Sequence, residues 1–508
     1  MKPLTVVTHY SPGPLFEKTL LSLTKSDLVE RIVIVSQEPI HFKLDKCHVL
    51  GSGSLPSQET LSLILDRIQT KHLLLLPWFR QISIEPEALE RYLEVAESTK
   101  AGLVYTDFYD ESAHTKTLHP LNDYRPGSVR DDFDFGAMML FSVPAIRKAL
   151  KTYGAIPEVT FAGLYDVRLK VSVDHSVFHF HEPLYTVTKT DEPSGDEKLF
   201  AYVDPRNEAV QKEMETVFTN YLKKIGAYLP PHDLREIEQT TESFAVEASV
   251  VIPVLNRKET ITDTVKSALS QETDFPFDVI VVDNHSADGT TIVLSDLARR
   301  YPNLKHIVPK RNDLGIGGCW NEAIQSEACG RYAVQLDSDD LYSTNHTLQR
   351  MVPMLRQGRY AMVIGSYTLV DFELREISPG LIDHREWTDE NGHNNALRIN
   401  GLGAPRAFDT SLMRKIGFLN VSYGEDYAAA LRICREYRIG RIYESLYFCR
   451  RWSGNTDAAL TLEDANRNDV FKDNIRTDEI LARQKIAESI GHSAKSKNRK
   501  TLRFEPVC

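Results

Sequence analysis

The chain has few of the features that mark secreted, membrane-spanning or nucleic-acid-binding proteins. Its 508 residues include only six cysteines, none in a C-x-x-C pair, which disfavours a disulfide framework or a zinc ribbon and fits a reducing compartment. No apolar run approaches the ~20 residues of a membrane helix, and the N-terminus lacks the apolar region of a signal peptide. The net charge of −11 argues against a nucleic-acid partner. We therefore expect a cytoplasmic protein.

The length and composition indicate several folded domains. With 42% hydrophobic and 26% charged residues, the chain has the composition of a globular protein. A chain of 508 residues exceeds what one hydrophobic core usually supports, so we expect two or three domains.

Short apolar runs occur in the same order in the two halves of the chain. They span 4–7, 31–36, 72–76 and 102–105 in the first half, and 249–252, 278–283, 332–336 and 362–365 in the second. The runs are β-branched and do not alternate, which is typical of strands buried on both faces of a mostly parallel sheet. Amphipathic stretches between them, such as 260–271 and 288–300, predict helices. The sequence therefore predicts an α/β fold of two tandem α/β/α domains.

The spacing of these runs divides the chain into four segments. A first domain is predicted over 1–205 and a second over 247–460. Between them, a charged helical stretch over 208–225 and the breaker Pro230-Pro231 indicate a helical linker over 206–246. Residues 461–508 are predicted to form a C-terminal helical region with a basic tail.

Three carboxylates lie within four residues directly after the apolar run 332–336. Asp337, Ser338, Asp339 and Asp340 thus stand at the end of a predicted strand, the edge where open α/β sheets bind ligands. Carboxylate oxygens suit Mg²⁺ or Mn²⁺, which bridges to nucleotide phosphates. A helix-capping cluster or a solvated turn is the alternative.

Other polar groups follow the same pattern in the second half. Asp283 ends a predicted strand, where it is placed to accept from a base or from ribose hydroxyls. Asn312 and Gly315 lie in a loop whose glycines permit close backbone approach. Glu425 and Asp426 open a predicted helix. Acids in a first helical turn often only face the helix dipole, and most glycine loops only make turns.

Taken in order, these motifs resemble glycosyltransferase family 2, the inverting family with the GT-A fold. The resemblance covers about 247–460 and rests on Pro253-x-x-Asn256-Arg257, Val282-Asp283-x-x-Ser286-x-Asp288-Gly289-Thr290, Asn312-x-x-Gly315, Leu336-Asp337-Ser338-Asp339-Asp340 and Gly424-Glu425-Asp426. The first half looks like a diverged copy of the same fold.

The resemblance implies a role for each motif. Asp337 and Asp339 would form the metal-binding D-x-D signature for Mn²⁺ or Mg²⁺, with Asp339 as the direct ligand. Asp426, beside Glu425, would be the general base that deprotonates an acceptor hydroxyl. Asp283 would contact the nucleotide base. The residues implied in donor binding are Pro253, Val254, Asn256, Asp283, Asn312, Gly315, Asp337, Ser338, Arg450 and Arg451.

One position departs from the family pattern. Many relatives carry a histidine near the metal or diphosphate after the last strand, and Trp452 stands at that place here. An indole cannot ligate a metal, so Arg450, Arg451 or Asn455 are the groups left to contact the diphosphate.

The first half lacks the acids of the second. Residues 76–80 contain no carboxylate where the second half has Asp337 to Asp340, and only Asp166 persists, opposite Asp426. We predict a non-catalytic domain that binds acceptor glycan, shapes a cleft or supports a homodimer. His175, His179 and His181 come close together in this half, but no carboxylate motif accompanies them, which favours a surface cluster over a metal site.

The whole pattern predicts an inverting hexosyl- or N-acetylhexosaminyltransferase that uses a nucleotide sugar, by resemblance a UDP-sugar. Its acceptor would be a hydroxyl of a glycan or lipid-linked glycan. A non-enzymatic glycan-binding scaffold and a sugar nucleotidyltransferase are the alternatives. The latter usually opens with a glycine-rich loop, which 253–257 lacks.

Two surface segments carry alternatives of their own. The basic residues of 493–503 fit either a peripheral contact with anionic lipid at the inner face of the membrane or a solvated tail. The polar segment 387–395 fits either a lid over the acceptor or a variable surface loop.

Overall fold

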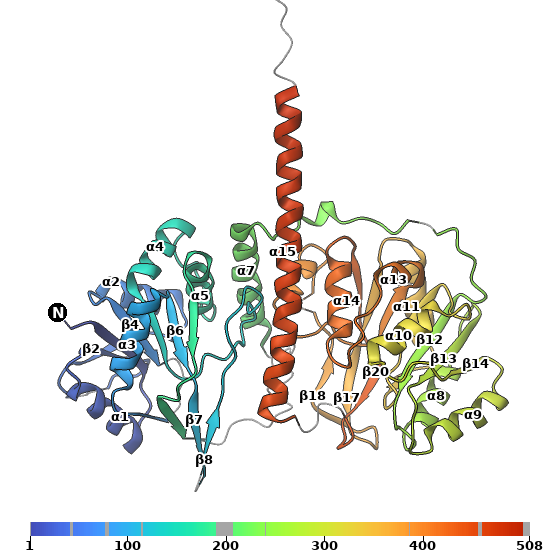
Figure 1. Ribbon diagram of the computed structural model, residues 1–508, viewed down its shortest axis with the longest axis horizontal. Helices are drawn as coiled ribbons and strands as arrows, with labels where there is room; N and C mark the ends of the chain where they lie inside the picture. The colour runs from blue at the N-terminus through green and yellow to red at the C-terminus, as the bar shows by residue number, and fades with distance from the viewer. Residues whose placement is uncertain are drawn as a thin grey trace, which may run out of the picture.

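The computed structural model describes residues 2–40, 44–76, 81–112, 115–188, 207–238, 240–385, 387–455 and 460–500, with side chains of the last helix up to Ser489. Two α/β units lie side by side, and the helix α15 (Leu462–Lys500) stands between them (Figure 1). Among the helices of the described residues, none combines the length and the apolar character that crossing a membrane requires.

The first half is built on a seven-stranded sheet in the order β10-β6-β9-β4-β1-β2-β3. Its pairs are parallel except the two that β9 makes with β4 and β6. The strands are β1 (Leu4–His9), β2 (Val29–Ser36), β3 (Cys47–Gly51), β4 (His72–Leu76), β6 (Leu103–Thr106), β9 (Met139–Ser142) and β10 (Val177–Phe180). Every residue of β1 and β4 is buried, as the apolar runs predicted.

The second half repeats this order in the sheet β14-β13-β12-β15-β19-β17-β20-β16. Again the central pairs are parallel except those of one strand, β19, with β15 and β17. The strands are β12 (Ala248–Val254), β13 (Phe277–Asp283), β14 (Leu304–Ile307), β15 (Tyr332–Gln335), β16 (Leu341–Tyr342), β17 (Met362–Val370), β18 (Glu376–Ile382), β19 (Arg406–Asp409) and β20 (Ile439–Arg450).

Even the edge strands correspond between the halves. In the first half, β5 (Gln81–Ile84), β11 (Tyr185–Thr188), β7 (Phe108–Ser112) and β8 (Thr115–His119) form a separate four-stranded sheet. In the second half, β16, the end of β20, the end of β17 and β18 pair in the same order, as extensions of the main sheet. The equal strand order confirms the predicted fold class of two tandem α/β units.

Helices connect and cover the strands of each unit (Figure 1). Those of the first half are α1 (Pro14–Lys25), α2 (Gln58–Arg67), α3 (Ala88–Thr99), α4 (Val143–Tyr153) and α5 (Gly163–Asp174). Those of the second are α8 (Ile261–Leu269), α9 (Thr290–Arg300), α10 (Ile316–Gln325), α11 (Thr347–Arg356), α12 (Gly392–Asn395), α13 (Thr410–Ile416) and α14 (Glu425–Cys434). The helices predicted over 260–271 and 288–300 are α8 and α9.

One hydrophobic core spans both halves. It contains Val129 and Tyr165 of the first half, Phe218 of the connecting helix α7 (Glu208–Ile225), and Trp320 and Tyr427 of the second half. The helix predicted in the linker is thus present, but it packs against α5 and α12 as part of the core. The domain boundaries at residues 205, 247 and 460 stay predictions.

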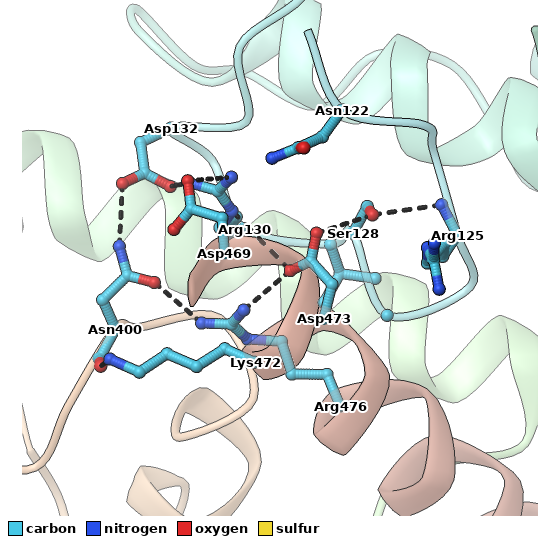
Figure 2. Close-up of polar contacts among 12 residues, drawn as sticks. Asn122, Arg125, Ser128, Arg130, Asp132, Asn400, Asp469, Lys472, Asp473 and Arg476 are labelled. Atoms are coloured by element: carbon cyan, nitrogen blue, oxygen red, sulfur yellow. Dashed lines mark hydrogen bonds and ion pairs between the residues drawn. The ribbon is translucent and has the colours of Figure 1, made fainter. Parts of the chain in front are cut away.

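Polar contacts, most of them partly buried, join the two halves to α15 (Figure 2). Arg130 of the first half pairs with Asp469 of α15 at 2.8 Å. Asn400 of the second half accepts a hydrogen bond from Arg476 of α15 at 2.8 Å and donates to Asp132 of the first half at 2.9 Å. Arg476 also pairs with Asp473 at 2.8 Å, and both side chains are buried. Because removing one partner of a buried ion pair is costly, this network holds three parts of the chain in one arrangement.

The segment 387–395 contacts this joint, and most of it is not the variable surface loop of the alternative interpretation. His393, Asn394 and Asn395 are buried. Asn391 donates to Thr219 of α7 at 2.8 Å, and Arg483 of α15 donates to the carbonyl oxygen of His393 at 3.0 Å. These polar residues satisfy one another and neighbouring helices, so 391–395 is not a free surface loop, and the interpretation of the segment as an acceptor lid stays a prediction.

Candidate active site

The predicted site residues gather at one edge of the second sheet. β12, β13 and β15 run parallel, and their carboxyl ends lead to Asn256, Asp283 and Asp337. Pro253 and Val254 lie in β12, with Val254 paired in register to Asp283. This is the edge at which open α/β sheets bind ligands.

The acid loop after β15 gives its three carboxylates different surroundings. Asp340 is buried, and its carboxylate accepts from the backbone N–H of Arg450 at 2.8 Å. Burial and the neighbouring Asp339 and Asp337 hold the pKa of Asp340 well above its usual range. The carbonyl oxygen of Ser338 accepts from Thr260 at 2.9 Å. Asp340 and Ser338 therefore fix the turn.

Asp339 is the carboxylate of this loop that is available to a ligand. Its Oδ2 accepts from the indole N–H of Trp452 and from the Asn455 amide, both at 3.3 Å, and Arg257 Nε lies 3.6 Å away. Both oxygens of Asp337 instead accept from Gln335 at 3.0 Å. Loosely held carboxylate oxygens fit Mg²⁺ or Mn²⁺, so Asp339 fits the ion better than Asp337 does.

A chain of polar contacts connects this loop to Asp426. Arg406 of β19 pairs with Asp426 at 2.6 Å and donates to the side-chain oxygen of Gln335 at 3.0 Å. Gln335 in turn holds Asp337. The acid loop and the start of α14 are thereby fixed relative to each other through one half-buried guanidinium.

The adjacent acids Glu425 and Asp426 have pKa values pushed in opposite directions. Burial and the neighbouring Asp426 raise the pKa of Glu425 to about 8. Burial would also raise the pKa of Asp426, but Arg406 and Lys472 outweigh it and lower that pKa. Near neutral pH Glu425 is protonated and Asp426 is a carboxylate, which is the state a general base needs.

Replacing Glu425 by glutamine should flatten the pH dependence of stability. The folded-state pKa of Glu425 lies above its ordinary value of 4.5, so its stabilising proton is lost as pH rises through about 8. The wild-type melting temperature should therefore fall more than that of Glu425→Gln between pH 6 and 9, by about 2–4 °C per kcal/mol. Thermal unfolding at pH 6, 7.5 and 9 measures this, with the exposed Glu272→Gln as control. Parallel curves for Glu425→Gln and wild type would show that Glu425 is already ionised at pH 6.

Asp283 is fully buried and orders the turn that follows β13. Its carboxylate accepts from the Ser286 N–H at 3.0 Å and the Thr291 hydroxyl at 2.5 Å, and His306 Nε2 lies 3.4 Å away. Burial would raise the pKa of Asp283, but the hydrogen bonds from His306, Thr291 and Ser286 hold it below its usual range. Contact of Asp283 with the nucleotide base stays a prediction. Such a contact requires the turn after β13 to open.

The neighbouring loops pack closely around this turn. Asn256, at φ +54°, accepts from the Ala287 N–H at 2.8 Å, and its own N–H donates to Ser286 at 2.9 Å. Gly315 donates from its N–H to Asn420 at 2.8 Å, and a Cβ there would lie 2.5 Å from the Val421 carbonyl carbon.

The remaining residues predicted to bind the donor are either exposed or bonded to other parts of the protein. Asn312 is exposed in the loop before α10. Arg450 is buried; its guanidinium donates to the carbonyl oxygen of Asp339 and lies 5.1 Å from the Phe372 ring centroid, so it supports the acid loop. Arg451 donates its N–H to Val370 at 2.8 Å. Contact of either arginine with a diphosphate stays a prediction.

Four residues of the site were not predicted from the sequence: Arg257, Gln335, Arg406 and Lys472. Arg257 stands inside the Pro253-x-x-Asn256-Arg257 motif, and Arg406 lies within 247–460, the range that the resemblance covers. Lys472 lies on α15, where its ammonium donates to the Asn400 carbonyl at 2.6 Å and lies 4.6 Å from the Tyr423 ring centroid. Nothing near Lys472 in the sequence connects it to Asp426.

Residues 249–417 match the family described as glycosyl transferase family 2. These residues belong to that family. The family 2 match includes Asp283, Asp337 and Asp339, and it ends before Glu425 and Asp426.

Relatives of the family 2 domain cover parts of the chain. Rv1520, an uncharacterised protein of Mycobacterium tuberculosis, is 28% identical over 107 residues, 21% of this chain and 31% of the relative. The Escherichia coli UDP-Glc:α-D-GlcNAc-diphosphoundecaprenol β-1,3-glucosyltransferase WfgD is 26% identical over 196 residues, 38% of this chain and 72% of the relative. The chain thus spans about a third of the first of these relatives. A crystal structure of S. aureus TarS with UDP-GlcNAc aligns with 47% of this chain and 72% of that chain, at 23% identity and a TM-score of 0.37.

Proposed function

We propose that the family 2 domain transfers a sugar, with inversion, from a nucleotide sugar to a hydroxyl of a glycan or lipid-linked glycan. The observation that carries this proposal is the link from Asp426 through Arg406 and Gln335 to the loop of Asp339. It supports a polar site that combines an ionised carboxylate with a carboxylate accessible to a ligand. A displacement of this kind needs an acceptor deprotonated on one side and a leaving diphosphate neutralised on the other.

The donor side is assigned to Asp339, Arg257 and Trp452. Asp339 would hold Mg²⁺ or Mn²⁺, and that ion would neutralise charge on the diphosphate. Arg257, 3.6 Å from Asp339, supplies a cation at the same place. The indole of Trp452 donates to Asp339 and so orients it where many relatives have a histidine. WfgD is named for UDP-glucose, which makes UDP-sugars the first donors to test.

The acceptor side is assigned to Asp426 and the groups around it. Asp426 takes the proton of the attacking hydroxyl, and Arg406 keeps Asp426 ionised and oriented. Lys472 of α15 is near enough to lower the pKa of Asp426. The partly exposed Asp132 of the first half and Asp469 of α15 belong to the contact network that includes Asn400. We infer that the first half and α15 shape the acceptor side without taking part in the chemistry.

We infer that the described residues of the first half form no second transfer site of this kind. Asp166, its counterpart to Asp426, is buried and pairs with Lys170 at 2.6 Å, and Lys170 also donates to the carbonyl of Ala155 at 2.8 Å. The segment 77–80, which corresponds to the acid loop, lies outside the described residues and contains no carboxylate.

A thermal-shift screen tests donor binding. The full chain should be stabilised by one nucleotide sugar, and more strongly with Mn²⁺ than with a chelator, because the bound ligand adds RT ln(1 + [L]/Kd) to the stability. Nucleoside diphosphates of each base and the free sugars serve as comparison ligands. Stabilisation by glycans alone, with no response to any nucleotide, would favour the alternative of a glycan-binding scaffold.

Two other expectations from the sequence remain predictions. A homodimer through the first half is one of them. Contact of the basic tail with anionic lipid is the other, and it falls on side chains beyond Ser489, outside the described residues, although the backbone of α15 is helical to Lys500.

A further inference from the structure

Two histidines and two aspartates of the first half converge at the end of β10, away from the acid loop. His179 belongs to β10 and His181 follows it, Asp107 follows the neighbouring strand β6, and Asp123 lies between β8 and β9. Ligand atoms of Asp107, His179 and His181 lie within 4.8 Å of one another. The sequence shows the histidines together, and only the fold adds the carboxylates.

Both ring nitrogens of His179 face carboxylates. Its Nε2 lies 2.9 Å from Asp107 Oδ1, and its Nδ1 lies 3.0 Å from Asp123 Oδ1. His181 approaches the same two groups, with Nε2 3.5 Å from Asp123 Oδ1 and Nδ1 3.9 Å from Asp107 Oδ2. A neutral imidazole has a single N–H, so this arrangement calls for a further positive charge beside His179, either a proton or a metal ion.

The inner half of the cluster is fixed and the outer half is open. The ring of Tyr105 stacks on His179 at 4.8 Å, and Asp107 accepts from the Leu121 N–H at 2.8 Å. His179 and Asp107 are buried, whereas the side chains of His181 and Asp123 are 67% and 56% exposed. A bound ion would therefore contact the preorganised inner side of the cluster, and the exposed side chains of His181 and Asp123 could move to ligate it.

We propose that this cluster binds a divalent transition metal ion, with Zn²⁺ the best chemical match. Asp123 Oδ1, His179 Nδ1 and His181 Nε2 are the proposed ligands, because Asp123 lies 3.0 and 3.5 Å from these two nitrogens. Asp107, which also lies in the group, then holds the other ring nitrogen of His179 at 2.9 Å. Ligands about 2.0–2.2 Å from a tetrahedral Zn²⁺ lie about 3.3–3.5 Å from each other. The separations of 3.0 and 3.5 Å from Asp123 to the two histidines are close to this value. Imidazole ligands disfavour Mg²⁺, and a carboxylate behind a ligating histidine is a common outer partner.

The place of the cluster gives the ion a structural role. Asp123 begins the stretch that leads to Arg125, Ser128 and Arg130, and these contact Asn474, Asp473 and Asp469 of α15 respectively. Fixing Asp123 to the end of β10 would hold this stretch, visible in Figure 2, against α15. The bound ion would therefore stabilise the contact between the first half and α15.

Zinc titration of the full chain tests the proposal. Calorimetry on chelator-treated protein, in an Asp339→Ala background that removes binding at the acid loop, should give one Zn²⁺ per chain and a raised melting temperature. His181→Ala and Asp123→Asn should each lower the affinity more than about 100-fold, and Asp107→Asn about 10–100-fold. His181 and Asp123 are exposed, so these two variants should fold, which far-UV circular dichroism checks.

His119→Ala is the matched control. His119 lies 2.7 Å from Asp110 in the same half, and among the described residues no second histidine joins that pair in a metal-ligating group. This variant should bind zinc like the parent. Absence of zinc binding in the parent, or a zinc affinity equal to the parent's in both His181→Ala and Asp123→Asn, would overturn the proposal.

Discussion

Replacing Asp339 by alanine should abolish the release of nucleoside diphosphate while the chain stays folded. Asp339 is the carboxylate of the acid loop whose contacts are long, 3.3 Å to Trp452 and Asn455, so its loss removes little packing. The substitution would remove the ligand of a metal ion that stabilises the transition state by several kcal/mol. The expected loss of rate is about 10³-fold or more. A coupled assay of diphosphate release with the donor found in the thermal-shift screen measures the effect.

Asp340→Asn is the control from the same loop. The buried Asp340 accepts from the Arg450 N–H, so an amide at this position keeps its size and its acceptor oxygen. We expect turnover within a few-fold of wild type. Equal losses in Asp339→Ala and Asp340→Asn would attribute the effect to the shape of the loop and would contradict a metal ligand at Asp339.

Replacing Asp426 by asparagine should slow transfer about 10²–10⁴-fold, the usual contribution of a general base. Asparagine keeps an oxygen for Arg406, whose contact with Asp426 is 2.6 Å, so the link to Gln335 and the acid loop should survive. Donor affinity should therefore change little while kcat falls. Steady-state transfer rates and donor calorimetry on the same preparation separate the two quantities.

The sister half supplies the matched control for Asp426→Asn. Asp166, in the first turn of α5, is the acid that the sequence comparison sets opposite Asp426 in the first turn of α14, but it pairs with Lys170 at 2.6 Å. Asp166→Asn should leave kcat unchanged. Wild-type kcat in Asp426→Asn, or loss of donor binding together with kcat, would refute Asp426 as the base.

The sequence predicted the fold through its repeated apolar runs. Because strands buried on both faces leave continuous apolar stretches, β1, β2, β4 and β6 were recognisable, and so were their counterparts β12, β13, β15 and β17. The strand order adds what the runs cannot show, namely that one antiparallel strand, β9 or β19, enters each sheet at the same place.

The candidate site was predicted where its residues follow strand ends, and missed where contacts come from elsewhere. Arg406 meets Asp426 only because β19 and α14 fold together, and Lys472 arrives on a helix beyond the last strand. The same limit explains the His179 cluster, whose carboxylates are distant in the chain, and segment 387–395, whose polarity suggested an exposed loop. Polar composition indicates exposure only when no buried partner exists, and partners are set by tertiary structure.

The number and metal dependence of donor sites test the central claim most directly. Calorimetric titration of the full chain with its preferred nucleotide sugar and Mn²⁺ should give one site per chain, with affinity strongly reduced by a chelator and by Asp339→Ala. Two sites per chain, or tight binding that is unchanged by both the chelator and Asp339→Ala, would contradict a single metal-assisted donor site in the family 2 domain.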